Sequence, residues 1–396
     1  MKNTSDGRLW ALEGLRGAAA IIVVIFHALL IFYTIALYGQ TYDPAAVQRF
    51  SFENLIYGNP LSVFTSGGFA VAIFFVLSGF VLSIGYFQTG NMDIIKKLAA
   101  KRYLRLMIPA LTSILLVWAI LSLGLATNLE AAKLTQSHWL ASIWNFTPNF
   151  FDAFFQGTWT IFVSGEYSYN PVLWTMFYEM TGSFLIFGFL GLFGRVPRRW
   201  LLYIVLILVS FQTFYLGFVL GLILADLYNQ GKAPFNIRRW WVKLSMLVLG
   251  LFLGGYPVQT VEGTVYQALS IFGSIVPDYF PFYTAIGAAL VITVILTWAP
   301  LERFFSWKPI SNLGKYTFSL YLTHKLVLFT ITTGMFISLY GQKGIGFHEA
   351  AILSILSSVP FIILVTYLFE KYIDSPSIRL SGLFSRWLLR RADKTE

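Results

Sequence analysis

Residues 10–37 read WALEGLRGAAAIIVVIFHALLIFYTIAL, and this stretch decides the fold. It is apolar throughout, except for Glu13 and Arg16 near its start and His27 in its middle. At about 1.5 Å per residue, a helix over these residues is long enough to cross a bilayer core of about 30 Å. We therefore expect a membrane-spanning helix here. The apolar run is too long for a cleavable signal, so this helix is expected to be a retained anchor.

Arg16 and His27 lie on one face of this expected helix. They are 11 positions apart, and eleven steps of roughly 100° end about 20° past three full turns. About 16 Å separates them along the axis, which puts the guanidinium near one membrane face and the imidazole near the midplane. An ionisable group at the midplane normally faces a bundle interior or a wet cavity. His27 is therefore a candidate general base or acyl acceptor; the alternative is a histidine that hydrogen-bonds a neighbouring helix.

The composition is typical of a polytopic membrane protein. Of the 396 residues, 57% are hydrophobic and 12% are charged, whereas soluble domains have about 25% charged residues. The chain has no cysteine and four histidines, so we expect no disulfide framework and no metal site. The net charge of +10 follows from positive residues gathered at one membrane face, and no nucleic-acid partner is expected.

Hydropathy and turn residues predict an all-α transmembrane bundle of about ten spans. The expected spans are 10–37, 63–87, 104–126, 171–193, 200–212, 213–229, 243–256, 280–299, 311–340 and 348–369. No internal repeat is visible, and the segment after Glu370 is short and basic. We therefore divide the chain into a transmembrane domain (1–370) and a basic cytoplasmic tail (371–396).

Residues 200–229 are long for one span and short for two, and charge decides between these alternatives. Lys and Arg accumulate in cytoplasmic loops. With two short passes, three of the 28 Lys and Arg lie outside and Lys325 lies in the membrane, which leaves 24 at the cytoplasmic side. One pass would put the basic residues of 238–243 on the wrong side. We therefore expect both termini in the cytoplasm, and a short fifth and sixth span packed within the bundle, where protein surrounds their backbone.

Two further ionisable residues are expected near the depth of His27. Glu179 lies about 12 Å from the outer end of the fourth span, where its carboxylate can orient the imidazole of His27. Alternatively, Glu179 pairs with an amine such as that of Lys325. His324 lies near the middle of the ninth span. It is either a packing histidine with a hydroxyl partner or a second catalytic or acceptor-binding residue.

Basic and small residues complete the set of candidates. Arg102 and Arg105 are three apart on one helical face and can bind phosphate oxygens, or they are ordinary positive charge beside anionic headgroups. The Ser78-Gly79 pair permits a bend or a close helix approach. The long outer loops are rich in Trp and Tyr, which either stack on sugar rings or form an interfacial aromatic belt.

Several of these segments together resemble the acyltransferase-3 family of integral-membrane enzymes. The first span of that family has an Arg, ten residues and a His, as in LEGLRGAAAIIVVIFH here. The other matching segments are FFVLSGF (74–80), Arg102 with Arg105, LWTMFYE (173–179), GKYTFSLYLTH (314–324), and Glu370 with Pro376. These segments follow the family order over nearly the whole chain. The departures are Glu13, where the family usually has Asp, and the less typical LWTMFYE.

The resemblance implies an O-acyltransferase of the plasma (inner) membrane. It implies transfer of an acyl group, most simply acetyl, from cytoplasmic acyl-CoA to a hydroxyl of a cell-surface or lipid-linked glycan. Arg16, Arg102 and Arg105 are expected to bind the donor, and His27, Glu179 and His324 to be catalytic. Acyl-CoA, the glycan acceptor and membrane lipids are the expected partners. The alternative is a transporter or flippase for a lipid-linked glycan, in which the same buried groups relay protons.

Overall fold

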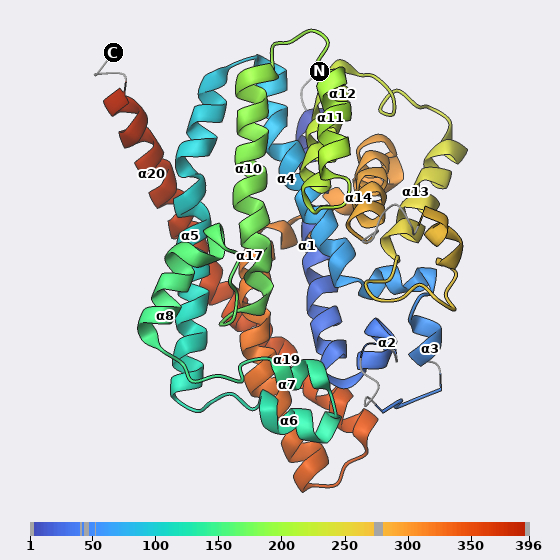
Figure 1. Cartoon of the computed structure of the whole chain (residues 1–396), viewed down its shortest axis with the longest axis vertical. Coiled ribbons are helices and arrows are strands. Elements are labelled where there is room, and N and C mark those ends of the chain that lie inside the picture. The colour runs from blue at the N-terminus through green and yellow to red at the C-terminus, as the bar shows by residue number, and fades with distance from the viewer. Residues whose placement is uncertain (1–3, 40–41, 43–46, 52, 273–279, 393–396) are drawn as a thin grey trace.

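The computed structural model describes residues 4–39, 42, 47–51, 53–272 and 280–392, and the regular elements within these ranges are helices. Figure 1 shows an elongated bundle in which both ends of the chain lie at the same end. We call this end the termini face. The opposite end contains the segment between α5 (Met92–Ser122) and α10 (Trp174–Phe193), and we call it the loop face.

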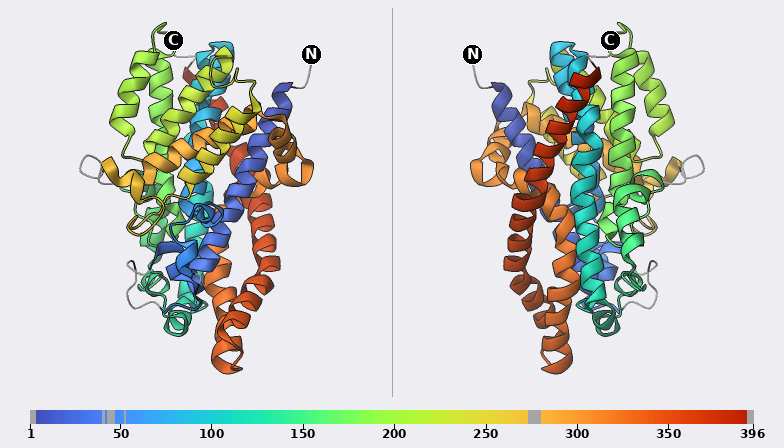
Figure 2. Two further views of the ribbon diagram at one scale, coloured as in Figure 1. Left: turned by 90° about the vertical axis from the view of Figure 1, so that its right-hand side faces the viewer. Right: turned by 90° about the vertical axis from the view of Figure 1, so that its left-hand side faces the viewer.

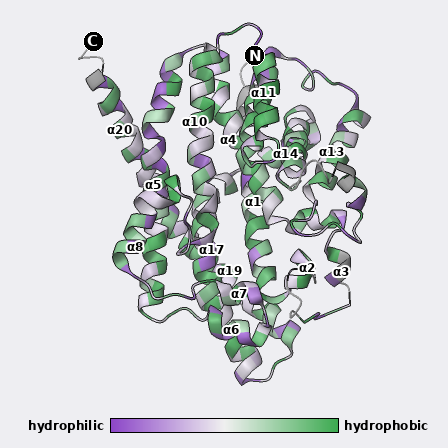
Figure 3. Ribbon diagram, in the orientation of Figure 1, coloured by the Kyte–Doolittle hydropathy of each residue, from purple (hydrophilic) through white to green (hydrophobic). Residues whose placement is uncertain are grey.

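Seven helical stretches among the described residues are long and apolar enough to cross a membrane. They are Trp10–Phe32, Gly67–Thr89, Met92–Ser122, Pro171–Phe193, Phe280–Thr297, Lys308–Gln342 and Phe347–Arg390. Trp200–Ser210 and Trp240–Gly254 are shorter apolar helices. Hydrophobic residues cover much of the long helices in Figure 3. A multi-pass helical membrane protein is thereby confirmed, whereas the count of ten spans and the cytoplasmic termini stay predictions.

Each expected span coincides with a helix, with shifted ends. The N-terminal helices are α1 (Thr4–Phe32), α2 (Thr34–Tyr38), α3 (Glu53–Ile56) and α4 (Gly67–Thr89). After α10 come α11 (Trp200–Ser210), α12 (Tyr215–Gln230), α13 (Trp240–Gly254), α14 (Phe280–Thr297), α15 (Ala299–Ser306) and α16 (Lys308–Ser311). The last helices are α17 (Leu313–Val327), α18 (Thr333–Phe336), α19 (Phe347–Phe369) and α20 (Ser375–Ala392). The first expected span is therefore interrupted after Phe32, and the third begins twelve residues earlier than expected.

Helix α4 lies in the interior of the bundle and is joined to α5 by a tight turn. The side chain of Ser66 caps its first turn by accepting a hydrogen bond from the backbone N–H of Phe69 (3.1 Å). Gly90 ends it in the left-handed conformation, and the Asn91 side chain caps α5. These caps allow α4 and α5 to run antiparallel and to carry Ser78 and Arg102 to one site.

Gly79 sets the contact between α4 and α12. A Cβ atom at this position would lie 2.1 Å from the carbonyl oxygen of Phe218, so only glycine permits this approach. The expectation of a close helix approach at Ser78-Gly79 is confirmed.

Gly17 has the same role between α1 and α17. A Cβ atom there would lie 2.4 Å from the Cβ of Leu313. The start of α17 therefore packs closely against the middle of α1.

The short pair α11 and α12 differs from expectation. Helix α12 is packed inside the bundle, with Phe218 and Leu222 fully buried. Helix α11 lies at the periphery, where Leu208 and Val209 are exposed. The prediction that both short spans are enclosed by protein is therefore wrong for α11. Its backbone is paired within the helix, so apolar side chains suffice on its outer face.

The helical stretch Lys308–Gln342 and helix α19 form a hairpin that projects beyond the other helices at the loop face, as Figure 2 shows. Residues Glu370–Asp374 form one turn of π-helix, called the π-turn below, that continues α19 into α20. Helix α20 lies along α5, and Ser385 donates a hydrogen bond to the carbonyl oxygen of Lys97 (3.2 Å). Most of the expected tail is thus a helix packed on the bundle.

The loop face is built from short helices. They are α6 (Asn128–Thr135), α7 (His138–Ser142), α8 (Phe150–Phe155) and α9 (Ile161–Val163). Helix α7 contacts α1, which brings Trp139 onto the ring of His27. The loop segment therefore contributes directly to the candidate site.

Candidate functional site

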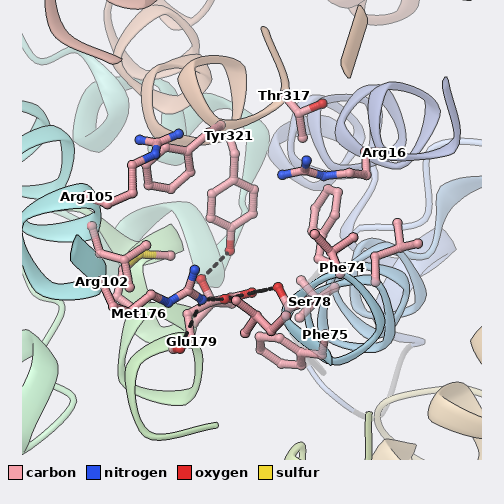
Figure 4. Close-up of a pocket in the computed structure, with 17 residues that line it drawn as sticks. Arg16, Phe74, Phe75, Ser78, Arg102, Arg105, Met176, Glu179, Thr317 and Tyr321 are labelled. Carbon is pink, nitrogen blue, oxygen red and sulfur yellow. Dashed lines mark hydrogen bonds and ion pairs between the residues drawn. The ribbon is translucent and has the colours of Figure 1, made fainter. Parts of the chain in front are cut away.

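Three arginines face one cavity of about 300 Å³ among α1, α4, α5, α10 and α17. They are Arg16, Arg102 and Arg105, and we call this space the arginine cavity (Figure 4). Most other side chains that line it are apolar. The expectation that Arg102 and Arg105 share a helical face agrees with this arrangement, and Arg16 joins them from α1.

Glu179 holds Arg102 in this cavity. The guanidinium of Arg102 forms an ion pair with the Glu179 carboxylate and donates a second hydrogen bond to the Glu179 backbone carbonyl (3.2 Å). The carboxylate also accepts a hydrogen bond from the hydroxyl of Ser78 (2.8 Å). Both charged side chains are largely buried, so the pair joins α5, α10 and α4 by charge-assisted contacts.

The other two arginines also have acidic partners. Arg105 forms an ion pair with Asp374 in the π-turn and lies near Ser377 (3.2 Å). Arg16 pairs with Glu13 one turn earlier (3.1 Å), and both side chains are more than one-third exposed. An arginine has five N–H donors, and the pairs use only some of them. Each guanidinium therefore keeps donors for a further anion in the cavity.

His27 and His324 form a pair in the middle of the bundle. Nδ1 of His27 lies 3.0 Å from Nε2 of His324, and the ring centroids are 5.0 Å apart. His324 is fully buried. Both histidines are expected near mid-depth from the sequence. Their direct contact was not predicted.

Backbone carbonyls determine which nitrogen of each ring has the proton. The carbonyl of Leu320 lies 2.9 Å from Nδ1 of His324 and can only accept, so this Nδ1 is protonated and Nε2 is an acceptor in the neutral ring. Nδ1 of His27 lies 3.0 Å from the carbonyl of Val23 and therefore also donates, to that carbonyl and to His324. We assign the free lone pair of His27 to Nε2 by this network.

A second cavity, of about 590 Å³, adjoins His27 on the side of the loop face, and we call it the histidine cavity. Trp139 stacks on the ring of His27, with centroids 6.0 Å apart and an interplanar angle of 22°. The other aromatic residues that line the histidine cavity include Trp144, Phe146, Tyr167 and Trp174. Trp139, Trp144 and Tyr167 belong to the loops that the sequence singled out for aromatic content.

The two cavities meet at Tyr321 and Val71, which line both. The hydroxyl of Tyr321 donates to the carbonyl of Val172 (2.8 Å) and lies 3.1 Å from the hydroxyl of Thr175. These contacts fix the ring at the boundary between the cavities. A molecule that reaches from the arginines to His27 must pass this ring.

The expected contact between Glu179 and His27 is not formed. Among the described residues, the Glu179 carboxylate contacts Arg102 and Ser78, and it lines the arginine cavity. It does not pair with Lys325 either, because that side chain lies over Trp139 and lines the histidine cavity. The hydroxyl partner suggested for His324 is replaced by Leu320 and His27.

Sequence reasoning missed the role of Asp374 and the contact of Trp139 with His27. Asp374 follows the last expected span and looks like part of a surface tail, although it holds Arg105. Trp139 lies in a polar loop segment, although it covers His27. Spacing along one helix reveals neither contact, since both depend on how distant segments pack.

The comparison with known families decides between the candidate classes. A family model described as an acyltransferase domain, the acyltransferase-3 model, matches residues 9–371. This chain belongs to the acyltransferase-3 family. No curated protein and no solved structure matches it significantly.

Membership of the acyltransferase-3 family makes the protein a membrane acyltransferase. The matched residues include both cavities and every side chain that forms the histidine pair and the Arg102–Glu179 ion pair. The resemblance to the acyltransferase-3 family is thereby confirmed.

Proposed function

We propose that this acyltransferase moves an acyl group, most simply acetyl, from acyl-CoA to a hydroxyl of a cell-surface or lipid-linked glycan. The termini face would be cytoplasmic, and the enzyme would lie in the plasma (inner) membrane. The observation that supports this proposal best is the pair of adjoining cavities, one with three arginines and one with His27. A donor and an acceptor can then meet from opposite membrane faces.

The arginine cavity suits a donor that has several phosphates. The guanidinium groups of Arg16, Arg102 and Arg105 keep N–H donors beyond those used by their carboxylate partners. Arg binds phosphate oxygens by two parallel hydrogen bonds. The phosphates of CoA would remain here, while its thin pantetheine arm extends past Tyr321 toward His27.

His27 supplies the chemistry. In one route, Nε2 takes the proton of the sugar hydroxyl as the sugar oxygen attacks the thioester carbonyl carbon. The carbon–sulfur bond breaks, and the leaving thiolate takes the proton. In the other route, Nε2 itself attacks the carbonyl carbon, the carbon–sulfur bond breaks, and CoA leaves as the thiolate. The sugar oxygen then displaces the imidazole, and the freed Nε2 takes the hydroxyl proton and passes it to the thiolate. Labelled acetyl-CoA without acceptor distinguishes them, because only the second route labels the protein.

Glu179 acts on the donor side in this proposal. Its carboxylate neutralises part of the charge of Arg102 and fixes the direction of the guanidinium. It is a positioning residue for the phosphate site, in place of the partner of His27 that the sequence suggested.

Release of CoA thiol tests the proposal. Purified protein incubated with acetyl-CoA and a surface-glycan extract as acceptor should release thiol, and His27→Ala should slow the release by about 10²- to 10⁴-fold. His138→Ala, an exposed histidine of α7, is the matched control. Release that persists in His27→Ala would remove the imidazole from the mechanism, and no release by the wild type would contradict acetyl-CoA as the donor. Mass spectrometry of surface glycans with and without the protein identifies the acceptor.

A further inference from the structure

Lys325 is a buried amine that no acidic side chain accompanies. The residue follows His324 in α17 and is 3% exposed. Its Nζ lies 5.3 Å from the ring centre of Trp139 and 5.9 Å from that of Phe329. None of the ion pairs among the described residues includes it. A buried ammonium without a counter-ion is costly, and intramembrane charges are normally paired.

The histidine cavity is the space into which this ammonium reaches. Lys325 lines it together with His27, and among the described residues that line it there is no aspartate or glutamate. Trp139 touches both, since its ring stacks on His27 and lies below the ammonium. Two aromatic rings partly stabilise the charge by cation–π contact. An anionic group in the cavity would supply the counter-charge that the protein does not.

We propose that the molecule held in the histidine cavity has an anionic group, a carboxylate or a phosphate, that pairs with Lys325. This inference rests on the proposed function, under which the cavity holds the glycan acceptor. The acceptor is then an acidic saccharide, whose ring stacks on the aromatic side chains while its anionic group lies against the ammonium. The hydroxyl that reacts lies next to His27, and the ring of Trp139 separates it from the ammonium.

Binding measured without any donor tests this inference. Three methyl glucosides share one ring and differ at carbon 6, as a uronate, a 6-phosphate and the neutral sugar. Each is titrated into the full-length protein, and the fluorescence of the tryptophans is followed, because Trp139, Trp144 and Trp174 line the cavity. A charge-assisted contact predicts that at least one anionic glucoside binds about tenfold or more tightly than the neutral one. Tightest binding of the uronate would identify the anionic group as a carboxylate, and tightest binding of the 6-phosphate would identify it as a phosphate.

Three variants locate the contact. Lys325→Met keeps the length of the side chain without its charge and should remove the anionic advantage. Lys325→Arg should retain most of it. Lys133→Met removes an exposed positive charge of α6 at the same face and should change nothing.

The inference is overturned if neither anionic glucoside binds more tightly than the neutral one to the wild type. It is also overturned if the advantage survives in Lys325→Met, since the anions would then bind at the arginines. Should Lys325→Met fail to fold, the wild-type comparison and Lys325→Arg decide. Because no acyl donor is present, anion preference without CoA-thiol release would refute only the proposed function. Transfer to neutral sugars alone would refute only this inference.

Discussion

Nδ1 of His27 lies 3.0 Å from Nε2 of His324, although 297 positions separate the two residues in the chain. His324 is itself anchored by the carbonyl of Leu320 at 2.9 Å. A buried ring thus fixes the tautomer and the direction of the ring that faces the cavity. This is the arrangement of a base and its orienting partner, built here from two helices of a membrane bundle.

His324→Ala should lower the turnover number roughly tenfold to hundredfold and leave the KM for acetyl-CoA within about twofold. The reason is that His27 loses one of the two acceptors of its Nδ1 proton and the ring that packs beside it, while the arginine cavity is untouched. The rate of CoA-thiol release against donor concentration measures both constants.

His324→Gln is the control for this role. Its side-chain oxygen can accept a hydrogen bond near the position of Nε2, so turnover should recover in part. Equal turnover of the Ala and Gln variants, both folded, would show that His324 only fills space.

The sequence predicted the spacing of residues along a helix better than the direction of their side chains. Helical rise gives the distance between Arg16 and His27 from spacing alone. Direction depends on rotation about the axis, and α10 is apolar on nearly every face, so no stripe marks its buried side. Neither partner predicted for the Glu179 carboxylate, His27 or Lys325, is therefore the right one. The carboxylate contacts Arg102 and Ser78.

The pairing of the basic residues was hidden for another reason. Arg102 and Arg105 differ by about 60° around the helix, so they share a cavity but reach different carboxylates, Glu179 and Asp374. The second carboxylate comes from a segment interpreted as a tail. Contacts between segments this far apart follow from the packing of α20 on α5, which no local pattern encodes.

Gly17→Ala should reduce catalysis without changing any side chain in either cavity. The added methyl would lie 2.4 Å from the Cβ of Leu313, which pushes α17 away from α1 and stretches the contact between His27 and His324. Such overpacking costs about 1–3 kcal/mol of stability. The measurements are the thermal unfolding temperature and the turnover number, and both should fall.

Gly188→Ala provides the comparison for this substitution. Gly188 also lies in a long helix, but a Cβ there has no neighbour within 4 Å. Its variant should therefore match the wild type in unfolding temperature and turnover. A Gly17→Ala protein with unchanged turnover would argue against the α1–α17 contact as the device that aligns the histidines.

Glu179→Gln should raise the KM for acetyl-CoA about tenfold and alter turnover little. The neutral amide no longer fixes the charge of Arg102, so the guanidinium is less well placed for phosphate. Glu179→Ala should in addition lower stability, on the order of 3 kcal/mol, because a largely buried arginine loses its partner. Glu130→Gln, an exposed position of α6, is the control. A drop in turnover at constant KM would instead restore the role of Glu179 beside His27.

Variants of Arg105 and Asp374 are expected to distinguish donor binding from the packing of α20 on α5. Asp374→Asn removes the ion pair but leaves Arg105 in the cavity, so the KM for acetyl-CoA should stay within about twofold. Arg105→Ala removes a phosphate ligand as well, and its KM should rise about tenfold. In both variants α20 loses a contact to α5, which makes local opening of this helix easier. Trypsin should then cut faster at Arg379 and Arg386, which are exposed residues of α20. If Asp374→Asn raised the KM as much as Arg105→Ala, the carboxylate would be part of the donor site and α20 would be its lid.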